Sequence, residues 1–296
     1  MSVLCFGEIL WDCFPDQSRI GGAPYNVAAH VKKLGGDSYV ISKLGDDDLG
    51  HAAMDKIKGH GVGTEFVQVS KDQPTGYVQV VLDERAIPTF TIIPDTAYDF
   101  IEADDETIEK IKAKNFDLFY FGTVAQKGEV SKAAVHKILD NVEFKEVFFD
   151  INIRKPFYSK ELIAESLPYA TILKINEDEC AMVGDMFFDT KEETAVIAKL
   201  FETYEKMHII LVTKGPNGAT IYTRDTHYDQ NYCISPAVDT VGSGDALSAG
   251  FITAYLRGDG VEKAGIVGNI MGDYVASQQG AIPEYDPEKL MAERLK

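Results

Sequence analysis

Residues 239–245 read Asp-Thr-Val-Gly-Ser-Gly-Asp, a glycine-rich turn with an acid at each end. An apolar segment follows, in which Leu247, Phe251 and Tyr255 recur at helical spacing. The first N–H groups of a helix have no partner within the helix and point outward, so this junction can bind an anion. A carboxylate beside such a site indicates phosphoryl transfer to a hydroxyl, with Asp245 taking the proton. A loop that ends in an ordinary helix cap is the structural alternative.

A second polar group follows the first predicted strand, at residues 3–6. Asp12 comes shortly after it, and the glycine pair at residues 21–22 precedes Asn26 in a helix predicted at residues 24–34. Both polar side chains could project from the carboxyl end of a sheet, where α/β proteins bind ligands. Asp accepts hydrogen bonds, Asn donates and accepts them, and glycines allow close approach, so the group suits a polyol. A polar turn with a helix cap is the alternative.

A third polar group follows a strand predicted at residues 147–151. Asp150, Asn152 and Arg154 would lie on one side if the chain stayed extended. If a carboxylate, an amide and a guanidinium face one pocket, each needs a hydrogen-bond or ionic partner, either in a ligand or in one another. Mutual pairing is therefore the alternative to ligand binding here.

Two further turns follow strands predicted at residues 171–175 and 208–213. In the first, Asn176 and Glu179 open a helix, where acids usually complement the helix dipole. The functional alternative is that they organise Mg²⁺ through waters. In the second, residues 213–218 (Thr-Lys-Gly-Pro-Asn-Gly) either hold a nucleotide tail or form a simple turn.

Short apolar runs without alternation, separated by amphipathic segments, predict a parallel sheet covered on both faces. The remaining predicted strands are at residues 39–42, 118–121 and 219–222, and the helices at residues 49–60, 129–141, 163–167 and 191–206. One region departs from this order, because residues 75–82 and 88–93 predict a hairpin with a turn at 83–86. We interpret it as a flap, joined by residues 11–20, that excludes water from a pocket. An ordinary edge hairpin is the alternative.

The composition indicates a globular chain with a large core, since 45% of its 296 residues are hydrophobic. With 29 Lys and Arg against 47 Asp and Glu, the net charge of −18 argues against nucleic acid and anionic membranes as partners. Cysteine and histidine spacings predict neither a disulfide framework nor a zinc site. The first residues lack a basic leader, and no apolar run approaches the ~20 residues that span a bilayer, so we expect a cytoplasmic protein.

Three common catalytic signatures are absent from the sequence. It contains no Gly-x-x-x-x-Gly-Lys-Ser/Thr loop, no Gly-x-Gly-x-x-Gly after the first strand and no Gly-x-Ser-x-Gly elbow. P-loop NTPases, classical dinucleotide folds and serine hydrolases are therefore disfavoured.

In chain order, these segments resemble the ribokinase/PfkB family of sugar kinases, in its fructokinase form. Residues 21–28 (Gly-Gly-Ala-Pro-Tyr-Asn-Val-Ala) look like its N-terminal signature, and residues 42–50 are similar to the segment that follows it. Residues 239–245 match its C-terminal signature Asp-Thr-x-Gly-Ala-Gly-Asp, with Ser243 where alanine is usual. Serine is small and keeps its N–H, so we expect this departure to be tolerated.

The resemblance implies an α/β, ribokinase-like fold in a single domain over residues 1–296. A central, mostly parallel sheet is flanked by helices, and a small antiparallel β lid is formed by about residues 11–20 and 75–94. The family transfers the γ-phosphoryl group of ATP to a sugar hydroxyl with Mg²⁺, often with a stimulating K⁺. In relatives the lid can also form a homodimer surface.

The resemblance also assigns roles to individual positions. Asp245 is the base, and the anion hole consists of the N–H groups of Gly242, Ser243 and Gly244. The sugar is held by Asp12, Gly22, Asn26 and Arg154. The nucleotide and its phosphates are bordered by Asn176, Thr213, Gly215, Gly218 and Asn269. Glu179 serves Mg²⁺ through water, and Asp239 with the carbonyl of Val241 would bind K⁺.

We predict an ATP-dependent sugar kinase that acts on the 6-hydroxyl of fructose. The fructose assignment rests on the Gly-Gly-Ala-Pro form and on residues 150–154, both by resemblance. Arg154 keeps 2-keto-3-deoxygluconate as an alternative, because a guanidinium pairs well with a carboxylate. A non-catalytic sugar-binding protein on the same fold and a Rossmann-type oxidoreductase are the rivals from other classes.

Overall fold

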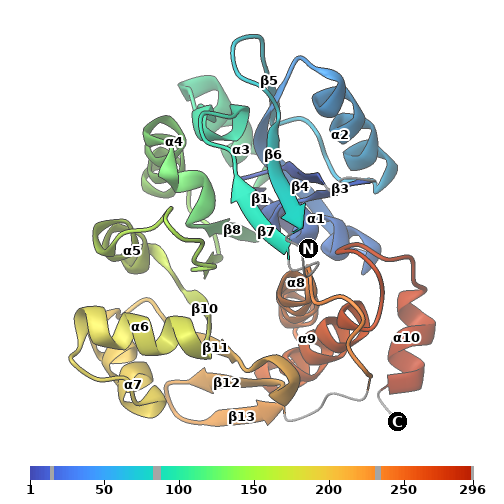
Figure 1. Ribbon diagram of the computed structural model, residues 1–296. Coiled ribbons are helices and arrows are strands. Elements are labelled where there is room, and N and C mark those ends of the chain that lie inside the picture. Colours follow the sequence, from blue (N-terminus) through green and yellow to red (C-terminus); the bar gives the residue numbers. More distant parts are fainter. Residues whose placement is uncertain (14–16, 83–87, 231–234, 295–296) are drawn as a thin grey trace.

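The computed structural model describes residues 1–13, 17–82, 88–230 and 235–294, and within these ranges its largest element is a nine-stranded sheet. The strands are β1 (Ser2–Phe6), β4 (Asp37–Gly45), β5 (Val67–Ser70), β8 (Leu118–Gly122), β9 (Glu146–Asp150), β10 (Ile172–Asn176), β11 (Ile209–Thr213), β12 (Ala219–Thr223) and β13 (His227–Gln230). Their order is β13-β12-β11-β10-β9-β8-β1-β4-β5. Pairing is parallel from β5 to β11 and antiparallel at β12 and β13 (Figure 1).

Helices cover both faces of this sheet. One face carries α1 (Ala23–Lys33), α2 (Asp48–Gly59), α8 (Ser243–Leu256) and α9 (Val261–Ala276). The other carries α3 (Asp105–Lys114), α4 (Glu129–Asn141), α5 (Lys160–Ser166), α6 (Glu177–Phe187) and α7 (Glu193–Thr203). The last helix, α10 (Pro287–Arg294), packs beside α9. The predicted α/β fold with a mostly parallel sheet is therefore confirmed.

The absence of alternation in the strands follows from this double cover. In β1, Val3 and Cys5 belong to the core on the α1 side, whereas Leu4 and Phe6 belong to the core on the opposite side. All four are at most 1% exposed. Each such side chain contributes about 1.5–3 kcal/mol by leaving water, so both faces of a central strand must be apolar.

A second sheet is built from β2 (Leu10–Cys13), β3 (Ser18–Gly21), β6 (Gly76–Leu82) and β7 (Pro88–Ile92), in the order β3-β2-β6-β7. It corresponds to the predicted lid, and we call it the lid sheet. The predicted hairpin, β6 with β7, is antiparallel, and so is the pair of β2 and β3, but β2 and β6 join the two pairs in parallel. The turn predicted at residues 83–86 lies outside the described residues. Because β2 begins soon after β1 ends, the lid sheet lies at the carboxyl edge of the large sheet.

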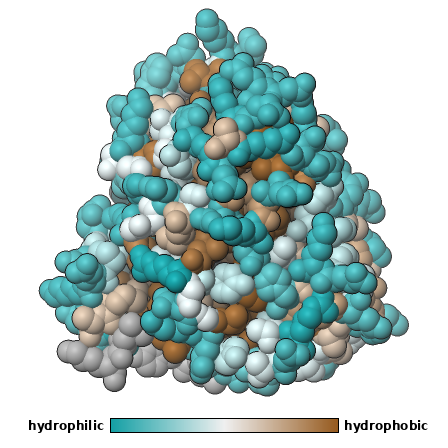
Figure 2. All heavy atoms as spheres, turned by 180° about the vertical axis from the view of Figure 1, so that it is seen from behind, coloured by the Kyte–Doolittle hydropathy of each residue, from teal (hydrophilic) through white to brown (hydrophobic). Residues whose placement is uncertain are grey.

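Hydrophilic residues cover most of the rear face of the molecule, with hydrophobic residues in smaller groups between them (Figure 2). In the described part of the chain, no helix is both long and apolar enough to cross a membrane. The thiols of Cys5, Cys13 and Cys180 are free, and Cys233 lies outside the described residues.

Candidate active site

The carboxyl ends of β1, β9, β10 and β11 reach the same edge of the sheet as the first turns of α1 and α8. Asp245 stands in the first turn of α8, and Asn26 in that of α1. Asn26 Nδ2 donates a hydrogen bond of 2.8 Å to Asp245 Oδ2. Two residues that are 219 positions apart therefore meet, because α1 and α8 pack side by side on one face.

The amide of Asn26 offers a free acceptor at this point. Its Oδ1 is buried and has no hydrogen-bond partner among the described residues. A buried polar atom without a partner is costly, so a hydroxyl donor from a ligand would relieve that cost. Asn26 can thus bind a polyol while its Nδ2 holds Asp245.

The carboxyl group of Asp245 is buried, and this shifts its titration toward neutral pH. Burial raises its pKa to about 6, while the hydrogen bond from Asn26 and the nearby charge of Lys174 act in the opposite direction. A base whose pKa lies close to the working pH is ionised and still binds a proton well.

The loop before α8 brings backbone N–H groups to the same place. Gly242 is the N-cap of α8 and has φ of 77°, a left-handed conformation that favours glycine. The N–H of Gly244 lies in the first turn, where a helix supplies no internal acceptor. Ser243 differs, because its N–H and its Oγ both donate to the Thr240 carbonyl, at 3.2 and 2.9 Å. The serine hydroxyl is thus accommodated within the turn.

We expect Gly242→Ala to destabilise the protein and Gly244→Ala to leave its stability unchanged. A Cβ at Gly242 would lie 2.5 Å from Ala281 Cβ, and the left-handed backbone alone costs a non-glycine residue about 1–2 kcal/mol. A Cβ at Gly244 would meet Lys174 Nζ at an ordinary 3.5 Å. Urea unfolding followed by circular dichroism measures both variants. Equal destabilisation of the two would contradict the geometry.

A buried lysine lies directly beneath this loop. Lys174 Nζ contacts both carboxylate oxygens of Asp150, at 2.9 and 2.8 Å, and the Tyr120 hydroxyl donates to Asp150 Oδ2 at 2.9 Å. Burial lowers the pKa of Lys174, but Asp150, Glu179 and Asp245 raise it overall, so the ammonium stays charged. The sequence argument missed Lys174. Its signal was a single charged residue within the apolar strand β10.

The prediction that Asp150, Asn152 and Arg154 share one face was conditional on an extended chain, and that condition is not met. β9 ends at Asp150, and Asn152 has φ of 42°, so the backbone turns there. Asp150 points inward to Lys174, whereas Arg154 is exposed. The positive charge of Arg154 still acts on this edge of the sheet, because it lowers the pKa of Glu8 against the larger effect of burial.

Glu8 is a further carboxylate that the sequence argument did not single out. It follows β1, is 5% exposed, and its Oε1 accepts a hydrogen bond of 3.2 Å from the Ala23 N–H. Burial raises its pKa to about 7, and Asp245 adds to the rise. Gly22, the N-cap of α1, passes so close that a Cβ there would lie 2.2 Å from the Glu8 carbonyl oxygen. Gly22 is therefore required sterically at this turn.

Asn176 and Glu179 form a reciprocal capping box at the start of α6. The Asn176 side chain accepts from the Glu179 N–H, and Glu179 Oε2 accepts from the Asn176 N–H. Glu179 Oε1 also accepts from the Ile153 N–H at 2.8 Å. Both carboxylate oxygens thus have backbone partners, and each keeps a lone pair for one further donor such as a water.

Four of the five residues predicted to border the nucleotide and its phosphates line one cavity of about 480 Å³, whereas Asn176 does not line it. Thr213, Gly215 and Gly218 reach it from the end of β11, and Asn269 from α9. Ser243 and Gly244 also line it, so the start of α8 forms part of its wall. The remaining lining residues are Pro216, Ser235, Ala237, Thr240, Leu247, Gly272, Asp273 and Ala276.

Asp12 lies in a smaller cavity of about 220 Å³, together with Asp239 and Val241. Burial, and then the neighbouring Asp239, raise the pKa of Asp12 to about 6, while Arg19 and Arg154 oppose this rise. The cavity lies between the lid sheet and the loop before α8.

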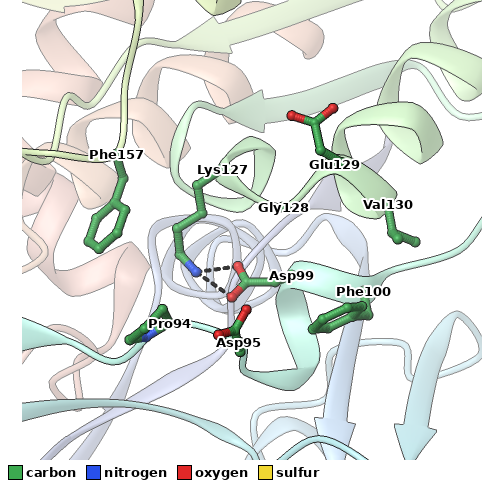
Figure 3. Close-up of a pocket in the computed structure, with 9 residues that line it drawn as sticks. All are labelled: Pro94, Asp95, Asp99, Phe100, Lys127, Gly128, Glu129, Val130 and Phe157. Carbon is green, nitrogen blue, oxygen red and sulfur yellow. Dashed lines mark hydrogen bonds and ion pairs between the residues drawn. The ribbon is translucent and has the colours of Figure 1, made fainter.

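A third cavity, of about 310 Å³, is lined by none of the predicted site residues. In Figure 3, Lys127 and Asp99 point toward each other and form a buried ion pair. The Lys127 ammonium also lies 4.7 Å from the Tyr98 ring centroid and 5.4 Å from that of Phe157. The pair anchors the segment after β7 to the segment after β8. The other lining residues are Pro94, Asp95, Phe100, Gly128, Glu129 and Val130.

Comparison with known proteins agrees with this arrangement. Residues 3–288 match the family described as pfkB family carbohydrate kinase. The chain belongs to the pfkB family. This kinase is 28% identical to probable fructokinase-5 of Arabidopsis thaliana over 327 residues, which cover 99% of this chain and 98% of that protein.

Solved structures share the fold of this pfkB kinase. Fructokinase from Xylella fastidiosa with bound ATP superposes with a TM-score of 0.85 at 20% identity, covering 100% of this chain and 99% of that one. Fructokinase from Vibrio cholerae O395, with fructose, ADP and calcium bound, gives a TM-score of 0.82 at 20% identity, covering 99% and 98%. The predicted ribokinase-like fold and family are therefore confirmed, and the pfkB chain is a carbohydrate kinase and thus a phosphotransferase.

Proposed function

We propose that this kinase transfers the γ-phosphoryl group of ATP to the 6-hydroxyl of D-fructose. The observation that carries the proposal is the position of Asp245. Its carboxylate is held by Asn26 on the side of the sugar-binding candidates, while the adjoining Gly244 lines the larger cavity. A base at the boundary between two sites is what transfer from a nucleotide to a hydroxyl requires.

The larger cavity is the proposed ATP site. Its volume is in the range of small-molecule pockets, and its walls combine glycines with the buried Asn269. The first turn of α8 faces it, so the transferring phosphoryl group would meet the N–H of Gly244 and the positive end of the helix dipole. These groups stabilise negative charge as it develops on the phosphoryl oxygens.

The reaction then needs one residue of the chain to accept a proton from the sugar hydroxyl. The sugar oxygen bonds to the γ-phosphorus, the bond to the bridging oxygen breaks, and ADP leaves. Asp245 takes the hydroxyl proton as the new bond forms. Mg²⁺ would neutralise negative charge on the phosphate groups. We propose that Glu179 reaches it through a water, which fits the lone pairs its oxygens retain.

The proposed sugar site comprises Asp12, Gly22, Asn26 and Arg154. Fructose is favoured by the resemblance and by relatives named as fructokinases. 2-Keto-3-deoxygluconate is the second candidate, because the guanidinium of Arg154 is exposed, its charge acts on Asp245, and it could pair with the carboxylate of that sugar. We further propose a cytoplasmic, single-domain enzyme that forms a homodimer through the lid sheet.

A coupled assay of ADP release tests the substrate. We expect kcat/KM to be highest for fructose in a panel with 2-keto-3-deoxygluconate, ribose, tagatose and adenosine. A higher kcat/KM for another sugar would overturn the fructose assignment but would still support a kinase. Sugar binding without ADP release from any compound would instead support a non-catalytic binding protein. Nicotinamide-dependent absorbance change without ATP would support an oxidoreductase.

A further inference from the structure

An arginine of the lid sheet forms an ion pair with the loop that precedes α8. Arg19 lies in β3, directly opposite Asp12 in the antiparallel pairing with β2. Its NH1 donates to Asp239 Oδ2 at 3.0 Å, across 220 positions of sequence. The two side chains are 33% and 19% exposed, so this ion pair is partly shielded from water.

The carboxylate of Asp239 accepts hydrogen bonds from three separate segments of the chain. Oδ1 accepts from the Val241 N–H at 3.1 Å, which shapes the loop that leads to Gly242. Oδ2 accepts from the Gly280 N–H at 3.1 Å as well as from Arg19. The lid sheet, the loop before α8 and the segment after α9 are therefore held together by one group.

This arrangement does not fit the K⁺ site that the resemblance places at Asp239 and Val241. The carboxylate already accepts three hydrogen bonds, and one of them comes from a cation. A second cation on the same oxygens would be repelled by the guanidinium beside it. Arg19 also shares the cavity of about 220 Å³ with Asp239 and Val241, so its positive charge acts where the ion would lie.

We propose that Arg19 supplies, from within the chain, the positive charge that relatives of this family take from K⁺. Arg19 is then a positioning residue that acts through Asp239 on the anion-hole loop, and turnover is independent of the monovalent cation. Because Arg19 belongs to the lid sheet, the same ion pair couples the position of the lid to the position of the N–H groups at α8. The inference rests on the proposed phosphoryl transfer but not on which sugar is accepted.

The test compares turnover in KCl, NaCl and choline chloride at constant ionic strength. The parent enzyme is expected to show equal kcat in the three salts. Arg19→Ala is expected to lose about tenfold to a hundredfold in kcat in choline chloride, because the loop is no longer held in place. K⁺ or low-millimolar guanidinium is expected to restore part of that loss. Lys110→Ala is the matched control, since it removes a cation from an exposed pair on α3, with Glu106.

Thermal unfolding gives a second readout that does not need turnover. K⁺ is expected to raise the melting temperature of Arg19→Ala relative to choline, and to have no such selective effect on the parent or on Lys110→Ala. Strong stimulation of the parent by K⁺, or an Arg19→Ala variant with unchanged kcat in choline chloride, would overturn the proposal. If no sugar is phosphorylated, the proposed function fails, while the melting data still decide whether Arg19 replaces the ion.

Discussion

Replacing Asp245 with asparagine is expected to lower kcat by about 10²–10⁴-fold while changing the affinity for the sugar little, because general-base catalysis contributes gains of that size. Asparagine keeps the shape and the contact with Asn26 but cannot take a proton. Steady-state kinetics give kcat, and isothermal titration with the preferred sugar gives affinity. Asp225→Asn, at an exposed position between β12 and β13, is the matched control.

The pH profile of the parent enzyme provides an independent check on this role. The pKa of Asp245 is raised to about 6, and only its ionised form can accept the proton. The value of kcat/KM should therefore be level above about pH 6 and fall about tenfold per pH unit below it. Glu8 and Asp12 also have raised pKa values and could cause the same fall in activity. If Asp245 causes it, the fall below about pH 6 must remain in Glu8→Gln and in Asp12→Asn. Near-normal turnover in Asp245→Asn would refute the assignment of the base.

The second large effect is expected at Lys174, where Lys174→Met should destabilise the fold by about 3–5 kcal/mol. The side chain of Asp150 is fully buried and would lose its ammonium partner, which leaves an uncompensated charge in the core. Chemical denaturation measures this loss. The change should also raise the pKa of Asp245, because Lys174 now lowers it, and so move the acid limb of the pH profile upward.

A double variant separates packing from charge at this position. Asp150→Asn removes the stranded carboxylate and keeps an acceptor for the Tyr120 hydroxyl, so Lys174→Met with Asp150→Asn should regain much of the lost stability. We expect its turnover to stay below that of the parent, because the cation beneath Gly244 is still missing. A single Lys174→Met variant as stable as the parent would contradict the buried-pair argument.

Much of the fold could be predicted from local patterns. Buried strands such as β8, β10 and β11 carry apolar runs, and the helices between them carry a repeat near 3.6, so their order along the chain fixes a mostly parallel sheet. Glycines at 22 and 242 mark turns that only glycine tolerates, and both precede helices as predicted. Thr213, Gly215 and Gly218 follow the end of one strand, which explains why one cavity gathers them. Asn269 reaches the same cavity from α9, which the strand pattern alone does not explain.

Partners far apart in sequence could not be predicted in this way. The sequence left open whether Asp150 pairs with Arg154 or faces a ligand, whereas the structure pairs it with Lys174, because the backbone turns at Asn152 and because β9 lies beside β10. Likewise, nothing near Asp239 in the sequence predicts its ion pair with Arg19, which the lid sheet brings to it.

The sequence by itself determined the elements, the motifs and the class of chemistry, because these depend on residue types at short, regular spacing. Only the tertiary structure decided which charges neutralise one another around Asp245. Such pairs depend on the order of strands in the sheet and on how the lid sheet lies over its edge. Neither can be predicted from the periodicity of neighbouring residues, because partners such as Arg19 and Asp239 are 220 positions apart.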